Sequence, residues 1–271
     1  MRHYTSADEP EVARIFRETL CLGRPLDFPL LGMDRYQRLC LNWFLRHGSD
    51  DVGVYEEDSR VHGYVLVCTD LASYHRWAAR TALAWTTQVV FGLAFGRLRD
   101  QDARFHRLRL RDGWTTARHA PSAPMPALVH VNLDRSARNT GAAQALLRFA
   151  DQRCAAAGRE GWFAEINTRN HRASALAAIG LHSIHSQPSH TLSWLLNEQV
   201  NRLTVVHTVG EPIGRATSAP AVPEAVAVPE AVAVPEAVSE TEAGSPSSTA
   251  TEASQTRELL AHQGTDTITT S

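Results

Sequence analysis

Residues 127–157 place a strand, a sharp turn and a helix in immediate succession, and this arrangement constrains the fold most strongly. The segment ALVHVNLD (127–134) is short, apolar and bounded by turn residues, which predicts a strand. From about residue 140 to 157, small and apolar side chains recur at helical spacing, and Gly158 predicts the end of this helix. The chain must therefore change from an extended to a helical backbone within the few residues before Gly141.

The turn of residues 138–143, RNTGAA, favours the binding of an anion. Backbone N–H groups in the first turn of a helix lack internal partners, and the helix dipole adds partial positive charge there. Gly141 lets a ligand approach closely because it has no Cβ. Arg135 and Arg138 can add charge-assisted hydrogen bonds to phosphate oxygens.

Other phosphate-binding motifs are excluded by the sequence. All 27 basic side chains are arginine, so the chain has no P-loop lysine and no Schiff-base lysine. No GxGxxG segment occurs, which argues against a dinucleotide site of the Rossmann type. The remaining interpretation is a pyrophosphate held at a strand-to-helix turn.

The chain divides into a folded domain, residues 1–210, and a tail, residues 211–271. Residues 221–238 repeat AVPEAV three times, and a proline in every repeat opposes helix and central strand. The tail has 9 acidic residues and 2 arginines, whereas residues 1–210 have 20 acidic residues and 25 arginines. We expect the acidic tail to be disordered because it has too little apolar surface to offset its conformational entropy.

Within the domain, the order of predicted elements indicates an α/β fold with a mixed central sheet. The expected strands are residues 2–5, 52–56, 61–69, 127–134, 161–168, 181–186 and 190–197. The expected helices are residues 12–20, 34–46, one or more within 71–112, 140–157 and 170–178.

An arginine-rich helical insertion, residues 71–118, is predicted between two of these strands. It has 9 arginines and 3 aspartates. Residues 81–96 lack charge over 16 positions, which is shorter than the ~20 apolar residues that a spanning helix needs. We expect a buried helix pair over the substrate side of the sheet. The alternative is an interfacial segment in which Trp85, Phe91 and Phe95 enter lipid beside arginines.

The strand, turn and helix of residues 127–157 resemble the cofactor-binding motif of the GNAT superfamily, the acyl-CoA-dependent N-acyltransferases. Its pattern, [QR]-x-x-G-x-[GA], is met by Arg138, Gly141 and Ala143. Asn170 followed by a short helix ending at Gly180 resembles a second family feature. The element order of residues 1–199 agrees with that fold. The insertion and the strand PALVHVNL are most similar to the acetyltransferase-like domain of O-GlcNAcase.

The resemblance implies a GNAT-like, mostly antiparallel sheet flanked by helices, and acetyl-CoA as co-substrate. It implies that a primary amine of a small molecule or peptide attacks the thioester directly in a ternary complex. The pantetheine arm would pair with the strand backbone around Val131 and Leu133, and Asn170 would contact the cofactor. The pyrophosphate would lie on the turn, formed by Arg138, Asn139, Thr140, Gly141, Ala142 and Ala143 with Arg135 nearby.

Candidate catalytic residues follow partly from the residues and partly from the resemblance. His130 has an ordinary pKa suited to proton abstraction, and Glu165 lies on the next strand; either side chain is a candidate base, or a structural residue of a half-buried strand. Many relatives have a tyrosine on the last helix that protonates the thiolate, but residues 173–179 have none. Ser174, His171 or water could replace it. Asn132 stands where the nearest branch often has a carboxylate.

These departures leave a second function open, a GNAT-fold protein that binds or senses acyl-CoA with weak or no transfer. A third hypothesis is a membrane-surface or scaffolding protein that uses the insertion and the tail. The N-terminus has no apolar signal segment, and four dispersed cysteines read as reduced thiols, so we expect a cytoplasmic protein. We expect no metal site, no nucleic-acid binding and no integral membrane segment, and we leave a homodimer open.

Overall fold

The computed structural model describes most of the predicted domain, namely residues 1–98, 100–119, 121, 124–138, 140–169, 176–177 and 179–214. Predictions for the tail beyond residue 214, and for Asn139, Asn170, His171 and Ser174, therefore lie outside the described residues. So does most of the expected helix at 170–178.

The described strands form one seven-stranded sheet in the order β1-β2-β3-β4-β5-β7-β6. Every neighbouring pair is antiparallel except β4 and β5, which are parallel. This is the mixed, mostly antiparallel sheet expected from the sequence. The strands are β1 (Arg2–His3), β2 (Val52–Glu57), β3 (Arg60–Cys68), β4 (Leu128–Leu133), β5 (Gly161–Thr168), β6 (His182–Pro188) and β7 (Asn201–Thr208).

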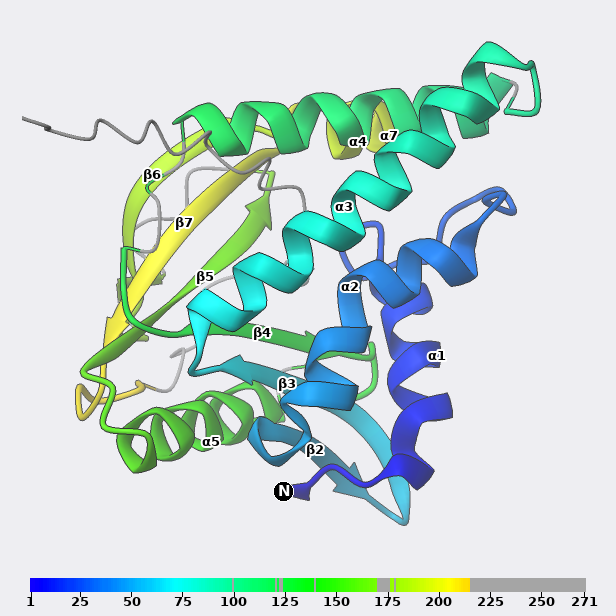
Figure 1. The fold of residues 1–271 in the computed structure, drawn as a ribbon. Helices are drawn as coiled ribbons and strands as arrows, with labels where there is room; N and C mark the ends of the chain where they lie inside the picture. The colour runs from blue at the N-terminus through cyan, green and yellow to red at the C-terminus, as the bar shows by residue number, and fades with distance from the viewer. Residues whose placement is uncertain are drawn as a thin grey trace, which may run out of the picture. The chain divides into compact units, whose positions relative to one another are not determined.

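Helices cover both faces of the sheet, and each face has its own hydrophobic core (Figure 1). Leu128 of β4 and Phe163 of β5 belong to the core beneath α1, α2 and α3, whereas Val129 and Val131 pack against α5. This alternation follows from the twofold side-chain period of a strand. The helices are α1 (Glu9–Thr19), α2 (Met33–His47), α3 (Leu71–Ala94), α4 (Asp100–His119), α5 (Ala142–Ala156) and α7 (His190–Leu196), with short 3₁₀ helices at Ser6–Asp8 and Ser49–Asp51.

The parallel strands β4 and β5 pair over a single register position, Leu128 with Phe163. On its other side β4 pairs with β3 along its whole length, from Leu128 with Cys68 to Leu133 with Gly63. The two parallel strands then diverge toward the C-terminal end of β4 (Figure 1). The sheet therefore opens between β4 and β5 at the end where the chain turns into α5.

The prediction of a strand at residues 190–197 is wrong, because these residues form helix α7 and the last strand is β7. Asp112 of α4 accepts hydrogen bonds from the backbone N–H groups of His190 and Thr191, at 2.7 and 2.9 Å, and so caps the new helix. The helix also lets Leu192 pack with Cys21, Leu22 and Val200. Sequence reasoning missed this helix because the capping carboxylate comes from a residue far away in the chain.

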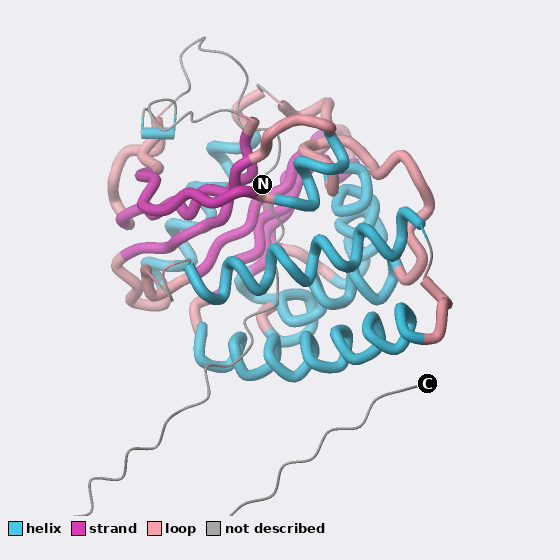
Figure 2. The backbone as a smooth tube through the Cα atoms, turned by 90° about the horizontal axis from the view of Figure 1, so that it is seen from above, coloured by secondary structure: helices cyan, strands magenta, loops and turns pink. Residues whose placement is uncertain are grey.

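The predicted insertion consists of α3 and α4, two helices that meet where they are joined and diverge from there (Figure 1), on one flank of the strands (Figure 2). Tyr74, Ala78, Ala82, Trp85 and Val89 of α3 are buried toward the core. Because Trp85 is buried, it does not take part in the interfacial surface considered as an alternative for residues 81–96. No helix among the described residues is long and apolar enough to cross a membrane.

Candidate functional site

The turn between β4 and α5 is organised by Asp134, the first residue after the strand. Its Oδ1 accepts hydrogen bonds from the backbone N–H groups of Ser136 and Ala137, at 3.0 and 3.2 Å. Its Oδ2 lies 3.0 Å from the ring Nδ1 of His62. Burial alone would raise the pKa of Asp134, but these hydrogen bonds outweigh burial and lower it. An ionised carboxylate therefore holds the start of the turn.

The end of the turn depends on Gly141, whose φ of 91° lies in the left-handed region. This residue is the N-cap of α5, and its carbonyl accepts the first helical hydrogen bond, from Ala145 at 3.1 Å. A β-carbon built on Gly141 would meet only the Oε1 atom of Gln144, at 3.6 Å. The backbone conformation therefore requires glycine, while the space beside it is open to a ligand.

Thr140 and Ala142 complete this part of the turn. The hydroxyl of Thr140 donates to the carbonyl oxygen of Ala137 at 2.8 Å, which closes the turn on itself. Ala142 is fully buried and Ala143 is half-buried. The N–H of Ala142 donates to the Thr140 hydroxyl oxygen at 3.4 Å, and the helix provides no acceptors of its own for the N–H groups of its first turn.

The two predicted phosphate-binding arginines have different surroundings. Arg135 is exposed at the surface of the turn. The Nη2 atom of Arg138 donates to the carbonyl oxygen of Gly23 at 2.8 Å, so Arg138 joins the turn to the segment that follows α1. Gly23 has a φ of 81°, and a β-carbon there would overlap the guanidinium of Arg138. Sequence reasoning did not identify Gly23, because the two residues are far apart in the chain.

His130, a predicted base on β4, lies in the core rather than at a solvent-lined surface. The residue is 2% exposed, and its ring packs against Phe44 of α2 with 5.7 Å between ring centroids. Neither ring nitrogen has a hydrogen-bond partner among the described residues. Burial lowers the pKa of His130 to about 3. The imidazole is therefore neutral at pH 7 and is a weak proton acceptor.

Asn132 follows His130 on the same face of β4 and is bound to Tyr64, a residue that sequence reasoning missed. The Nδ2 atom of Asn132 donates to the phenol oxygen of Tyr64 at 2.6 Å, and the two residues lie opposite each other on β4 and β3. Burial raises the pKa of Tyr64, so the phenol remains protonated at neutral pH. The pairing of β3 with β4 was the signal that could have revealed this contact.

Glu165 brings a carboxylate to the other wall of the opening, on β5. It lies two residues after Phe163, so its side chain faces the same side of the sheet as Leu128, His130 and Asn132. The side chain is 12% exposed, and its Oε2 lies 3.5 Å from Nη1 of Arg202 on β7. The structure therefore places His130, Asn132 and Glu165 on one face, with the turn that the sequence predicts to bind an anion at the end of β4.

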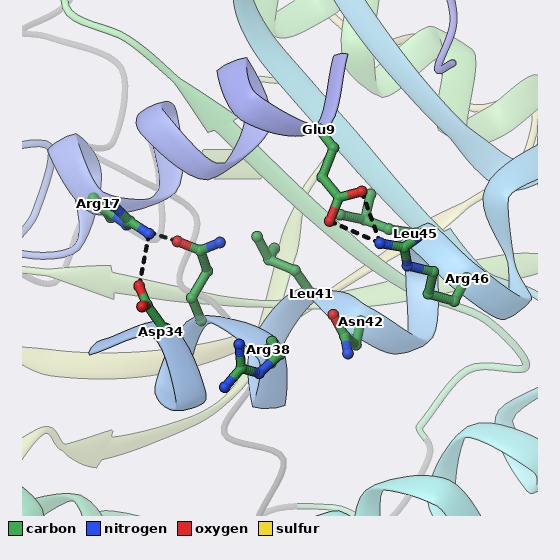
Figure 3. Close-up of a pocket in the computed structure, with 9 residues that line it drawn as sticks. Glu9, Arg17, Asp34, Arg38, Leu41, Asn42, Leu45 and Arg46 are labelled. Atoms are coloured by element: carbon green, nitrogen blue, oxygen red, sulfur yellow. Dashed lines mark hydrogen bonds and ion pairs between the residues drawn. The ribbon is translucent and has the colours of Figure 1, made fainter. Parts of the chain in front are cut away.

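A separate pocket of about 400 Å³ lies between α1 and α2 (Figure 3). Its two carboxylates are already paired: Glu9 lies 2.9 Å from Arg46, and Asp34 lies 2.9 Å from Arg17. None of the predicted site residues lines it.

Among the described residues, no group of three or more His, Cys, Asp or Glu side chains could hold a metal ion. All four cysteines are buried and outside any disulfide.

Comparison with solved structures identifies proteins of similar fold. The crystal structure of SsHAT shares 18% identity over 78% of this chain and 98% of its own, with a TM-score of 0.51. A GCN5-related N-acetyltransferase from Kribbella flavida shares 15% identity over 76% and 95% of the two chains, with a TM-score of 0.44. The protein yncA from Salmonella typhimurium, solved with its cofactor acetyl-CoA, shares 12% identity over 80% and 97%, with a TM-score of 0.43.

Neither protein-family models nor curated proteins give a match to this chain. The likeness to solved structures therefore concerns the fold. The central sheet and its flanking helices are those of a GNAT-like fold, as the sequence predicted.

The burial of His130 predicts a pH dependence of stability. Because the pKa of this group is lowered in the folded chain, His130 favours folding fully above its unfolded pKa of about 6.5 and progressively less as the pH falls toward 3. Relative to the parent, the His130→Leu variant should therefore gain about 1.4 kcal/mol in free energy of unfolding for each unit by which the pH is lowered from 6 to 4. Urea unfolding at several pH values measures this difference.

NMR of the parent protein provides an independent check. In the parent protein, the NMR resonances of the His130 ring should not titrate between pH 8 and 5. A His130 resonance that titrates near pH 6.5 would show that the imidazole reaches solvent and would restore it as a candidate base.

Proposed function

We propose that this chain is an N-acetyltransferase that transfers an acetyl group from acetyl-CoA to a primary amine of a small molecule or peptide. The observation that carries the proposal is the opening between β4 and β5, which leads directly to the glycine turn before α5. A long, thin cofactor with a diphosphate near one end suits this combination of a split sheet and a helix N-terminus. The GNAT-like fold supports the same assignment.

The residues at the turn fit a diphosphate. The space beside Gly141 is open, the N–H groups at the start of α5 face it, and Arg135 adds positive charge at the surface. The chain has no lysine, so arginine and backbone N–H groups are its strongest phosphate donors. In this proposal the pantetheine arm pairs with β4 near Val131 and Leu133, and Asn139 and Asn170 complete the contacts.

Transfer would proceed by direct attack of the amine on the thioester carbonyl. The nitrogen forms a bond to the carbonyl carbon, the carbon–sulfur bond breaks, and CoA leaves as a thiolate that takes up a proton. A base must first remove a proton from the ammonium group. Glu165 is the better candidate than His130, because its carboxylate lies at the opening whereas the imidazole is a weak base in the core. Ser174 stays a candidate for the proton delivered to the thiolate.

The finer family assignment, to the branch resembling the acetyltransferase-like domain of O-GlcNAcase, is also part of the proposal. It is supported by the helical insertion before β4 and by the strand sequence PALVHVNL.

One observation favours an alternative, a protein that binds acyl-CoA without transferring the acyl group. The face of β4 that borders the opening presents the Asn132 amide, which is no base, and the buried, neutral His130. If Glu165 also fails to act, the cofactor site would remain without a base. The two predictions that follow separate cofactor binding from acetyl transfer.

Acetyl-CoA binding should depend on Gly141. In Gly141→Glu, the side chain would fill the space beside the turn and set a carboxylate against the diphosphate, so we expect acetyl-CoA affinity to fall by more than about tenfold. Isothermal titration calorimetry measures this loss. Gly158→Glu is the matched control, because Gly158 has a φ of 65° and open space but follows the other end of α5. Equal losses in both variants, or no binding by the parent, would contradict the proposed cofactor site.

Acetyl transfer should depend on Glu165. With a panel of primary amines, the parent should release CoA, and Glu165→Gln should lower kcat by about a hundredfold while the KM for acetyl-CoA stays unchanged. Glu198→Gln, which removes an exposed carboxylate paired with Arg169, should behave like the parent. Binding of acetyl-CoA without CoA release for any amine would favour the sensor instead. Full activity of Glu165→Gln would assign the proton transfer to another group.

A further inference from the structure

The outer face of α3 carries large apolar side chains that the fold does not use. Leu83 and Phe95 are 69% and 70% exposed, and Val90 and Phe91 are more than half exposed. The buried residues of this helix lie on its opposite side. Phe91 and Phe95 stack on each other, with 5.9 Å between ring centroids, and still face outward. We call Leu83, Val90, Phe91 and Phe95 the apolar stripe.

The outer face of α4 carries a row of arginines. Arg104, Arg107, Arg111 and Arg118 recur at intervals of three, four and seven residues, which places them on one side of the helix. All four are exposed, and they extend over about 21 Å at the helical rise. Trp114 belongs to the same row and is half exposed, with the guanidinium of Arg118 4.5 Å from its ring centroid. We call these four arginines the arginine stripe.

Several other arginines of the domain are paired with carboxylates, whereas the arginine stripe is not. Arg14, Arg46 and Arg153 each lie within 3 Å of a carboxylate. In the part of the chain that the structure describes, no ion pair includes a member of the arginine stripe. The insertion therefore presents exposed arginines without ion pairs on α4, of which Arg104 lies 5.0 Å from the ring centroid of Trp194, and apolar side chains on α3 that the fold leaves uncovered.

We propose that the outer face of the α3–α4 hairpin binds membrane surfaces that contain anionic phospholipid. Apolar side chains beside arginines are the combination by which an interfacial helix enters the headgroup region: the apolar groups reach the acyl chains and the cations meet the phosphates. The two helices follow each other in the chain and meet where they are joined, so both stripes belong to one hairpin (Figure 1). Neither helix is apolar enough to cross the bilayer, which agrees with binding at the surface.

A second copy of this chain fits the same face less well. In a twofold-symmetric dimer the same patch lies on both subunits, so the arginine stripe would approach another arginine stripe. Among the carboxylates of α4, Asp100, four residues before Arg104, lies in that row, so one acid faces four arginines, and Asp112 is buried and bound at the N-terminus of α7. A bilayer supplies phosphates over the whole length of the arginine stripe without such a conflict.

Co-sedimentation of the full chain with vesicles tests the proposal. The chain should bind vesicles of phosphatidylcholine mixed with phosphatidylserine at low salt, bind phosphatidylcholine alone much less, and lose binding as salt is added. Arg107→Glu with Arg111→Glu should lower the partition coefficient by about thirtyfold, at roughly a fivefold loss for each arginine. Phe91→Ser with Phe95→Ser should weaken binding to the same vesicles without changing the net charge.

The control is Arg60→Glu with Arg148→Glu, which changes the net charge equally on exposed residues at the start of β3 and on α5. It should keep more of the binding than the α4 variant. Equal loss in both would overturn the proposal, because binding would then reflect net charge alone. Absence of binding to the anionic vesicles by the parent would also overturn it, as would a parent dimer that dissociates in the phenylalanine variant.

Amide hydrogen exchange of the parent, with and without vesicles, keeps the test independent of whether the variants fold. Protection confined to residues 83–118 is the expected result. Protection elsewhere, with the hairpin unchanged, would overturn the assignment of the face.

Discussion

The single position at which β4 and β5 pair, Leu128 with Phe163, is the constraint on which the rest of the structure depends. Each of these strands is held along its other edge: β3 pairs with all of β4, and β7 pairs with all of β5. The opening between them is therefore fixed by two complete ladders and does not depend on a mobile loop. Because α5 connects β4 to the diverging β5, its N-terminus lies beyond the C-terminal end of β4, where the two strands have separated.

Because the chain has no lysine, arginine is the basic side chain available at that turn. Asp134 uses its carboxylate to order the backbone, and Arg138 binds the carbonyl of Gly23, so the turn is tied both to itself and to the segment after α1. What remains for an anion is the start of α5, the exposed Arg135 and the space beside Gly141. In our proposal, fixed N–H donors and planar guanidinium groups bind the phosphates, in place of a flexible lysine.

Local sequence signals predicted the part of the fold that local interactions determine. The strand and helix expected at 127–134 and 140–157 correspond to β4 and α5, and the need for glycine at 141 follows from its φ of 91°. The missed features depend on residues distant in the chain. Helix α7 begins where Asp112 caps it, and the pKa of His130 is low because Phe44 and its neighbours bury the ring. The contact between Asn132 and Tyr64 likewise required the register of β3 with β4.

A crystal structure of the full chain with acetyl-CoA would test the central claim most directly. Our account predicts that the pantetheine arm lies between β4 and β5, with the diphosphate on the backbone N–H groups of residues 140–143 and the thioester on the face of Glu165. A cofactor bound elsewhere, for example in the pocket between α1 and α2, would contradict it. So would an additional ladder of hydrogen bonds that closes β4 onto β5 in the crystal.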